Sequence, residues 1–134
     1  MPDGQLWTET AMLSLNTVMI NSEEPARLKE FYTKLLGEPG WTGGEFTGWK
    51  AGAAYLMVGP HSDVKGTNEM PGRLLFNFET ADVKSEFDRL VGLGVQAVQE
   101  PYQPGEAGGE MWLATLADPD GNYFQLASPM PEDM

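Results

Sequence analysis

The chain has 134 residues, 41% of them hydrophobic, which fits one domain with one core, and no apolar run approaches the roughly 20 residues that a membrane span needs. Acidic side chains outnumber basic ones 20 to 8, for a net charge of −12, which excludes nucleic acids and anionic membrane surfaces as partners and favours neutral or cationic small molecules. Cysteine is absent and the acidic start Met1-Pro2-Asp3-Gly4 lacks the features of a secretory signal, so disulfides and thiolate chemistry are excluded and a cytoplasmic location is expected.

The first half of the chain predicts a strand, a helix and two more strands. The first strand covers residues 13–20, and Ser22 is positioned to cap the helix that follows. Gly37 ends this helix, whose apolar face repeats at helical spacing and consists of Leu28, Phe31, Tyr32, Leu35 and Leu36. Two strands at 45–51 and 53–58 turn at Gly52. The stretch 60–72 is polar and rich in Gly and Pro, which predicts a linker.

The same order of elements returns after the linker. A strand is predicted at 73–78, followed by a helix with Asp82 as its capping residue. The apolar face of this helix consists of Val83, Phe87, Leu90 and Val91. A strand at 95–98 and a loop at 101–109 lead to a final hairpin, with strands at 110–116 and 122–127 that turn on Asp118-Pro119-Asp120-Gly121.

This repetition indicates an internal duplication. An offset of 56 residues places Glu30-Phe31 over Glu86-Phe87, and the same offset places Thr17 over Arg73. We therefore expect an α+β fold, a single domain over residues 1–134 made of two similar modules at about 12–59 and 73–129. Each module has a curved sheet with a helix on one face, and the other face is either buried or forms a cavity.

Two segments of the chain carry a family resemblance. The first helix contains Phe31-Tyr32 followed by Leu36-Gly37, and the last turn is Ala117-Asp118-Pro119-Asp120-Gly121-Asn122. Together with the internal repeat, they resemble the glyoxalase/bleomycin resistance protein/dioxygenase (vicinal oxygen chelate, VOC) superfamily over nearly the whole chain. The resemblance implies two βαβββ modules that form a cupped mixed sheet, usually in a homodimer whose chains share each cup.

The resemblance also implies where the superfamily's enzymes hold a divalent metal: a His or Gln on the first strand, a His on the first strand of the second half, and a Glu on the last strand. These positions hold Thr17, Arg73 and Gln125 here. A threonine hydroxyl is a weak ligand and arginine is always cationic, so this set is unsuited to a metal. The only histidine, His61, lies in the linker, where a solvated surface residue is expected. We therefore expect no metal and no cofactor, as in the superfamily's metal-free antibiotic-binding members.

Strand alternation assigns side chains to the cup. If Gln125 points into the cup then Tyr123 does too, while Phe124 and Leu126 pack under the helix. The full set of predicted ligand-binding residues is Thr17, Phe46, Trp49, Tyr55, Met57, Arg73, Leu75, Asn77, Met111, Trp112, Thr115, Tyr123 and Gln125. Such an aromatic, methionine-rich wall suits a large flat ligand. A place in the core is the alternative for each aromatic residue, and a salt bridge to a nearby Glu is the alternative for Arg73.

Three functions are compatible with this pattern. The first is a metal-free binding protein that sequesters a hydrophobic or aromatic compound, such as an antibiotic, for self-resistance. The second is a metal-free isomerase, lyase or cyclase acting on a secondary metabolite, with Glu45, Glu79 or Glu100 as a general base that the sequence does not single out. The third is a glyoxalase-like metalloenzyme with unusual ligands. No catalytic residue is assigned.

Overall fold

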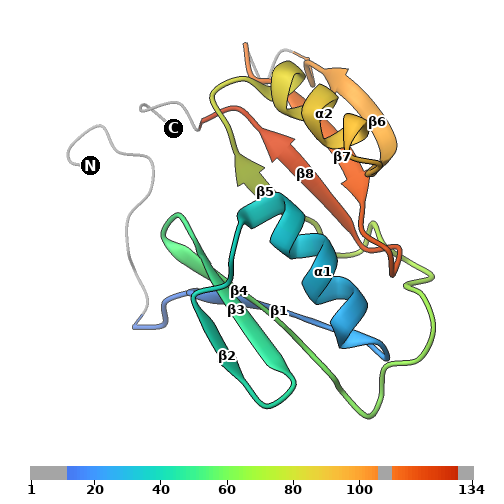
Figure 1. The fold of residues 1–134 in the computed structure, drawn as a ribbon. Coiled ribbons are helices and arrows are strands. Elements are labelled where there is room, and N and C mark those ends of the chain that lie inside the picture. Colours follow the sequence, from blue (N-terminus) through green and yellow to red (C-terminus); the bar gives the residue numbers. More distant parts are fainter. Residues whose placement is uncertain (1–11, 106–109, 130–134) are drawn as a thin grey trace. The chain divides into compact units, whose positions relative to one another are not determined.

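Two compact units make up the protein in this computed structural model, which describes residues 12–105 and 110–129 (Figure 1). The N-terminal unit comprises residues 15–74 together with the turn 117–122. The C-terminal unit holds residues 75–116 and the last strand. Neither helix in the described part of the chain is long and apolar enough to cross a membrane.

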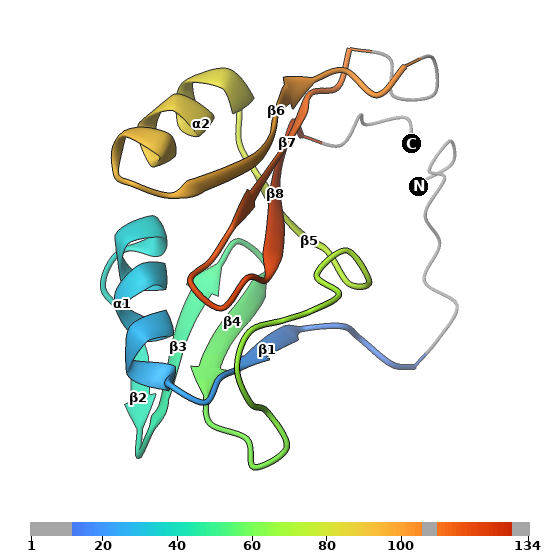
Figure 2. The same ribbon diagram turned by 90° about the vertical axis from the view of Figure 1, so that its right-hand side faces the viewer.

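The N-terminal unit contains one helix and a four-stranded sheet. Its elements are β1 (Thr17–Asn21), α1 (Pro25–Leu36), β2 (Trp41–Gly43), β3 (Phe46–Ala51) and β4 (Ala54–Gly59). The strand order is β1-β4-β3-β2, with β1 parallel to β4 and the other pairs antiparallel. Helix α1 covers one face of this sheet (Figure 2). The three-residue strand β2 was not predicted, because it ends at the Gly43-Gly44 pair, which is typical of a turn.

Helix α1 follows its predicted apolar pattern, although its cap differs. Leu28 and Tyr32 are fully buried against the sheet. Gly37 ends the helix with φ of 91°, and its N–H donates to Thr33 O at 2.8 Å. The prediction that Ser22 caps α1 is wrong: Glu24 is the N-cap residue, without a side-chain cap. Ser22 Oγ instead accepts from Glu24 N at 2.9 Å, which forms a turn just before the helix.

The C-terminal unit repeats the plan with a second sheet and helix. Its elements are β5 (Phe76–Glu79), α2 (Val83–Gly92), β6 (Gln96–Tyr102), β7 (Leu113–Ala117) and β8 (Tyr123–Ala127). The strand order is β5-β8-β7-β6, and β5 runs parallel to β8. The predicted α+β fold with two βαβββ modules is therefore confirmed.

The core of the C-terminal unit is aromatic. The rings of Phe76 and Phe78 lie 6.1 and 5.7 Å from the ring of Phe124. Asp82 caps α2 as predicted, since its side chain accepts from Ser85 N at 3.1 Å. Val91 was predicted on the buried face of α2 but is exposed.

Two strand boundaries in the C-terminal unit differ from the prediction. Strand β5 starts at Phe76 rather than at Arg73, and β6 continues through Pro101-Tyr102, where a loop was expected. The rest of that expected loop includes residues 106–109, which lie outside the described residues.

Candidate functional site

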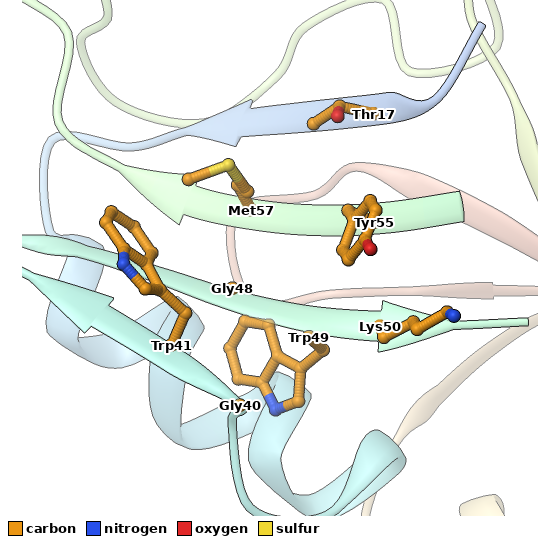
Figure 3. Close-up of a pocket in the computed structure, with 8 residues that line it drawn as sticks. All are labelled: Thr17, Gly40, Trp41, Gly48, Trp49, Lys50, Tyr55 and Met57. Atoms are coloured by element: carbon orange, nitrogen blue, oxygen red, sulfur yellow. The ribbon is translucent and has the colours of Figure 1, made fainter. Parts of the chain in front are cut away.

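An open hollow of about 500 Å³ lies on the sheet of the N-terminal unit (Figure 3). All eight residues around it belong to this unit: Thr17, Gly40, Trp41, Gly48, Trp49, Lys50, Tyr55 and Met57. The side chains on the α1 side of the same strands, such as Ile20, Leu56 and Val58, are buried in the core. Because strand side chains alternate, the hollow belongs to the face that α1 does not cover.

One end of the hollow is an apolar row of residues that are direct partners across the strands. Trp41 pairs with Gly48, Gly48 with Met57, and Met57 with Met19. A Cβ atom added at Gly48 would meet Met57 Cγ at 3.4 Å and Trp41 Cε3 at 3.7 Å. One added at Gly43 would lie 2.7 Å from the Trp41 ring. The two glycines therefore leave a flat seat for the indole, and Gly48 forms the floor between the indole and the thioether.

A polar row follows two residues further along β3. Lys50 pairs with Tyr55, and Tyr55 pairs with Thr17. Two residues of strand span about 7 Å, which sets the separation of the two rows. The Thr17 hydroxyl donates to Asn16 Oδ1 at 2.8 Å. Figure 3 shows Trp41 and Lys50 at opposite ends of the hollow, with Tyr55 and Met57 between them. The sequence interpretation missed Lys50, although its spacing from Gly48 places it on the same face.

Two aromatic residues predicted to line the cup have other roles in the N-terminal unit. Trp49 borders the hollow, but its side chain is only 2% exposed, and its indole N–H donates to Gly37 O at 2.8 Å. Its ring lies 6.4 Å from that of Tyr32, so it belongs to the core beside α1. Phe46 packs over Gly59, where its ring fills the space that a Cβ atom would take.

The predicted site residues of the C-terminal unit lie on its own sheet. Gln125 Nε2 donates to Thr115 Oγ1 at 3.1 Å, and Asn77 pairs with Gln125 across β5 and β8. These three residues therefore share one face, opposite the buried Phe124. Tyr123 is half-buried on the same strand.

The remaining predicted residues of the second half lie outside the strands. Met111 and Trp112 directly precede β7, and Lys84 Nζ lies 4.0 Å from the centroid of the Trp112 ring. Leu75 and Arg73 precede β5. Arg73 is exposed, and its guanidinium contacts Met70 Sδ at 3.3 Å. The prediction of a strand position for Arg73 is therefore wrong.

The residues at the superfamily's metal positions do not fit a metal. The last residues of β1 and β5, Asn21 and Glu79, align the two modules with an offset of 58 rather than 56 residues, which matches Thr17 with Leu75. A hydroxyl bonded to Asn16, an alkyl side chain and the amide of Gln125 offer no anionic or imidazole donor. Among residues 12–105 and 110–129, no three His, Cys, Asp or Glu side chains gather into a set that could hold a metal ion.

A buried carboxylate fixes the last turn on α1 within the N-terminal unit. Asp118 accepts from Tyr32 Oη at 2.7 Å, from Asp120 N at 2.9 Å and from Asn122 N at 3.0 Å. Arg27 on α1 forms an ion pair with the buried Asp120. Burial raises the pKa of Asp118 above its usual value, although the hydrogen bonds from Tyr32 and Asn122 oppose this.

The pKa of Tyr32 is raised well above its usual value, by burial first and then by the charge of Asp118, so its hydroxyl stays neutral and donates. The two segments that carry the family resemblance thus contact each other. Sequence spacing did not show this contact, whose partners are 86 residues apart. Its role is structural, because neither group is among the residues around the hollow.

Comparison with known proteins agrees with this architecture. The family model described as "Glyoxalase-like domain" matches residues 17–127. Among solved structures, a glyoxalase-related enzyme from Fulvimarina pelagi has a TM-score of 0.69 at 19% identity, covering 91% of this chain and 95% of that one. A glyoxalase/bleomycin resistance protein from Albidiferax ferrireducens T118 has a TM-score of 0.69 at 20% identity, with coverages of 86% and 98%. The values for a lactoylglutathione lyase from Agrobacterium tumefaciens are 0.66, 17%, 86% and 92%. No curated protein matches the sequence. The chain therefore belongs to the glyoxalase-like domain family of the VOC superfamily.

Proposed function

We propose that this protein binds a flat hydrophobic or aromatic small molecule in the hollow, without a metal, and sequesters it in the cytoplasm. An antibiotic held for self-resistance is the proposed ligand class. The observation that carries the proposal is the exposure of two aromatic side chains at an apolar hollow: Trp41 is 52% exposed and Tyr55 is 47% exposed. Ligand sites are typically concave and apolar with a few polar groups, and exposed aromatic surface of this kind is typical of them.

The energetics favour a planar ligand. Each ring stacked on an aromatic side chain gains about 0.5–1.5 kcal/mol beyond the apolar area that it buries. Met57 adds a polarizable thioether beside the floor at Gly48. A flat molecule can therefore lie on the apolar row without any side chain having to move out of the hollow.

We further propose that the protein acts as a homodimer, as is usual for single-domain members of the superfamily. Met19 is 50% exposed and continues the apolar row next to Met57. A second wall over this surface would turn an open hollow into a closed cup and would bury more of the ligand. Light scattering coupled to size-exclusion chromatography tests this, and a mass of one chain at micromolar concentration would contradict the dimer.

The binding test is a titration of a panel of polycyclic and glycopeptide antibiotics, followed by tryptophan fluorescence and then by calorimetry for compounds that quench. We expect Trp41→Ala to weaken binding about tenfold, a loss of about 1.4 kcal/mol. The control is Tyr102→Ala, which removes a 38% exposed aromatic residue from β6 in the other unit and should leave binding unchanged. No binding by any compound at micromolar concentration, or equal losses in both variants, would refute the proposal.

Chemical analysis of the bound compound separates binding from catalysis. A binding protein returns every compound unchanged after prolonged incubation. The metal-free isomerase, lyase or cyclase alternative instead requires a converted product whose amount grows with time.

A further inference from the structure

We infer that the hollow selects flat aromatic compounds that carry an anionic group, with the ring over Trp41 and the anion on the ammonium of Lys50. This inference rests on the proposed function and specifies the ligand class that the same hollow takes. It makes Lys50 a specificity-determining residue.

The geometry of the two rows supports this class of ligand. The apolar row at Trp41 and Gly48 offers a stacking surface with no charged group, and the polar row at Lys50 lies about 7 Å further along β3. A fused two-ring system with an acidic substituent is about this long. Figure 3 shows the Lys50 side chain at the end of the hollow opposite Trp41, where such a substituent would lie.

The charge distribution at the hollow supports an anion rather than a cation. Lys50 is the only charged residue among the eight around the hollow. Within residues 12–105 and 110–129, no carboxylate lies within 4 Å of its ammonium, so the charge is not neutralised by an ion pair. Its neighbours across the sheet, Tyr55 and Thr17, carry hydroxyls that can donate hydrogen bonds to the same anion.

The net charge of −12 led to the opposite expectation of a neutral or cationic ligand. The distance dependence of electrostatics resolves the difference. At physiological ionic strength, charges further than about 8 Å from the ligand are largely screened, whereas Lys50 acts in direct contact. The distant acidic groups lower the rate at which an anion arrives, but they do not remove the local preference.

The test compares 2-naphthoate with its neutral isostere 2-naphthamide. Binding is followed by the indole N–H signal of Trp41 in ¹H–¹⁵N spectra, assigned with Trp41→Phe. The indole of Trp49, which is bonded to Gly37 O, is the internal reference. We expect the wild-type protein to bind naphthoate about fivefold more tightly than naphthamide, the range for a solvent-exposed ion pair.

The variant Lys50→Met should equalise the two affinities, while Lys50→Arg should retain the preference. The matched control is Lys34→Met on α1, which changes the net charge by the same one unit but lies away from the hollow. A preference that survives in Lys50→Met, or that is lost equally in Lys34→Met, would overturn the inference. Equal binding of both compounds by the wild-type protein would also overturn it while leaving the proposed function intact. If neither compound nor the antibiotic panel moves the Trp41 signal, the proposed function fails as well.

Discussion

Replacing Tyr32 with phenylalanine tests the buried contact between α1 and the last turn. Tyr32 is fully buried, and its hydroxyl donates to the Asp118 carboxylate at 2.7 Å. Phenylalanine keeps the ring, with its edge-to-face contact to Phe31. The loss is therefore one hydrogen bond to a charged acceptor, which contributes about 1.5–3 kcal/mol. Asp118 keeps its bonds from Asp120 N and Asn122, so the low end of that range applies, about 2 kcal/mol.

For a chain of this length, 2 kcal/mol corresponds to a fall in melting temperature of about 7 °C. The assays are thermal unfolding by circular dichroism and urea unfolding at pH 7. The same substitution at the half-exposed Tyr55 is the control, and we expect it to change the free energy of unfolding by less than about 0.5 kcal/mol. If Tyr32→Phe is no more destabilising than Tyr55→Phe, the assignment of the Tyr32–Asp118 bond as a main anchor of the turn is wrong.

Three further outcomes are expected. The variant Gly48→Val should weaken ligand binding by about tenfold with little loss of stability, because its methyl groups enter the floor of the hollow beside Met57; calorimetry and a melting curve measure both, and unchanged affinity contradicts the assigned floor. Gly59→Ala should cost about 1–3 kcal/mol in urea unfolding, since the added Cβ overlaps the Phe46 ring, and wild-type stability would contradict that packing. Hydrogen bonds from Ser85 lower the pKa of Asp82, so the ionised cap stabilises the fold above about pH 4 and this contribution is lost as the pH falls through the lowered value; Asp82→Ala should thus reduce the melting temperature at pH 7 but not at pH 2, and an equal reduction at both would refute this.

Local sequence signals predicted most of the fold, because they report on single elements. The apolar spacing of Leu28 and Tyr32 identified the buried face of α1, and Asp82 identified the start of α2. The signals failed where the outcome depends on a neighbouring strand. The strand β2 pairs with β3 through Trp41 and Gly48, and nothing local distinguishes its three residues from a glycine-rich loop.

The candidate site was predictable in part for the same reason. Alternation correctly placed Tyr55 and Met57 on the face of the hollow, because both lie within one regular strand. Trp49 was assigned to the rim on residue type alone, but its indole has a partner at Gly37 O, beyond the reach of a pattern. The error at Arg73 came from the helices: they align with an offset of 56 residues, whereas the ends of β1 and β5 align with 58.

The position of the last turn in the N-terminal unit has a consequence for how the protein is made. Tyr32 and Arg27 leave the ribosome early, but Asp118 and Asp120 follow 86 and 93 residues later. At 5–20 residues per second, this delay is roughly 4–17 s for the Tyr32–Asp118 pair. During that interval the buried surface of α1 lacks its carboxylate partner, and a chain that stops before residue 117 never acquires it. The first module to be synthesised is thus completed by one of the last segments, so nascent chains of this protein depend on reaching nearly full length before their N-terminal half is secure.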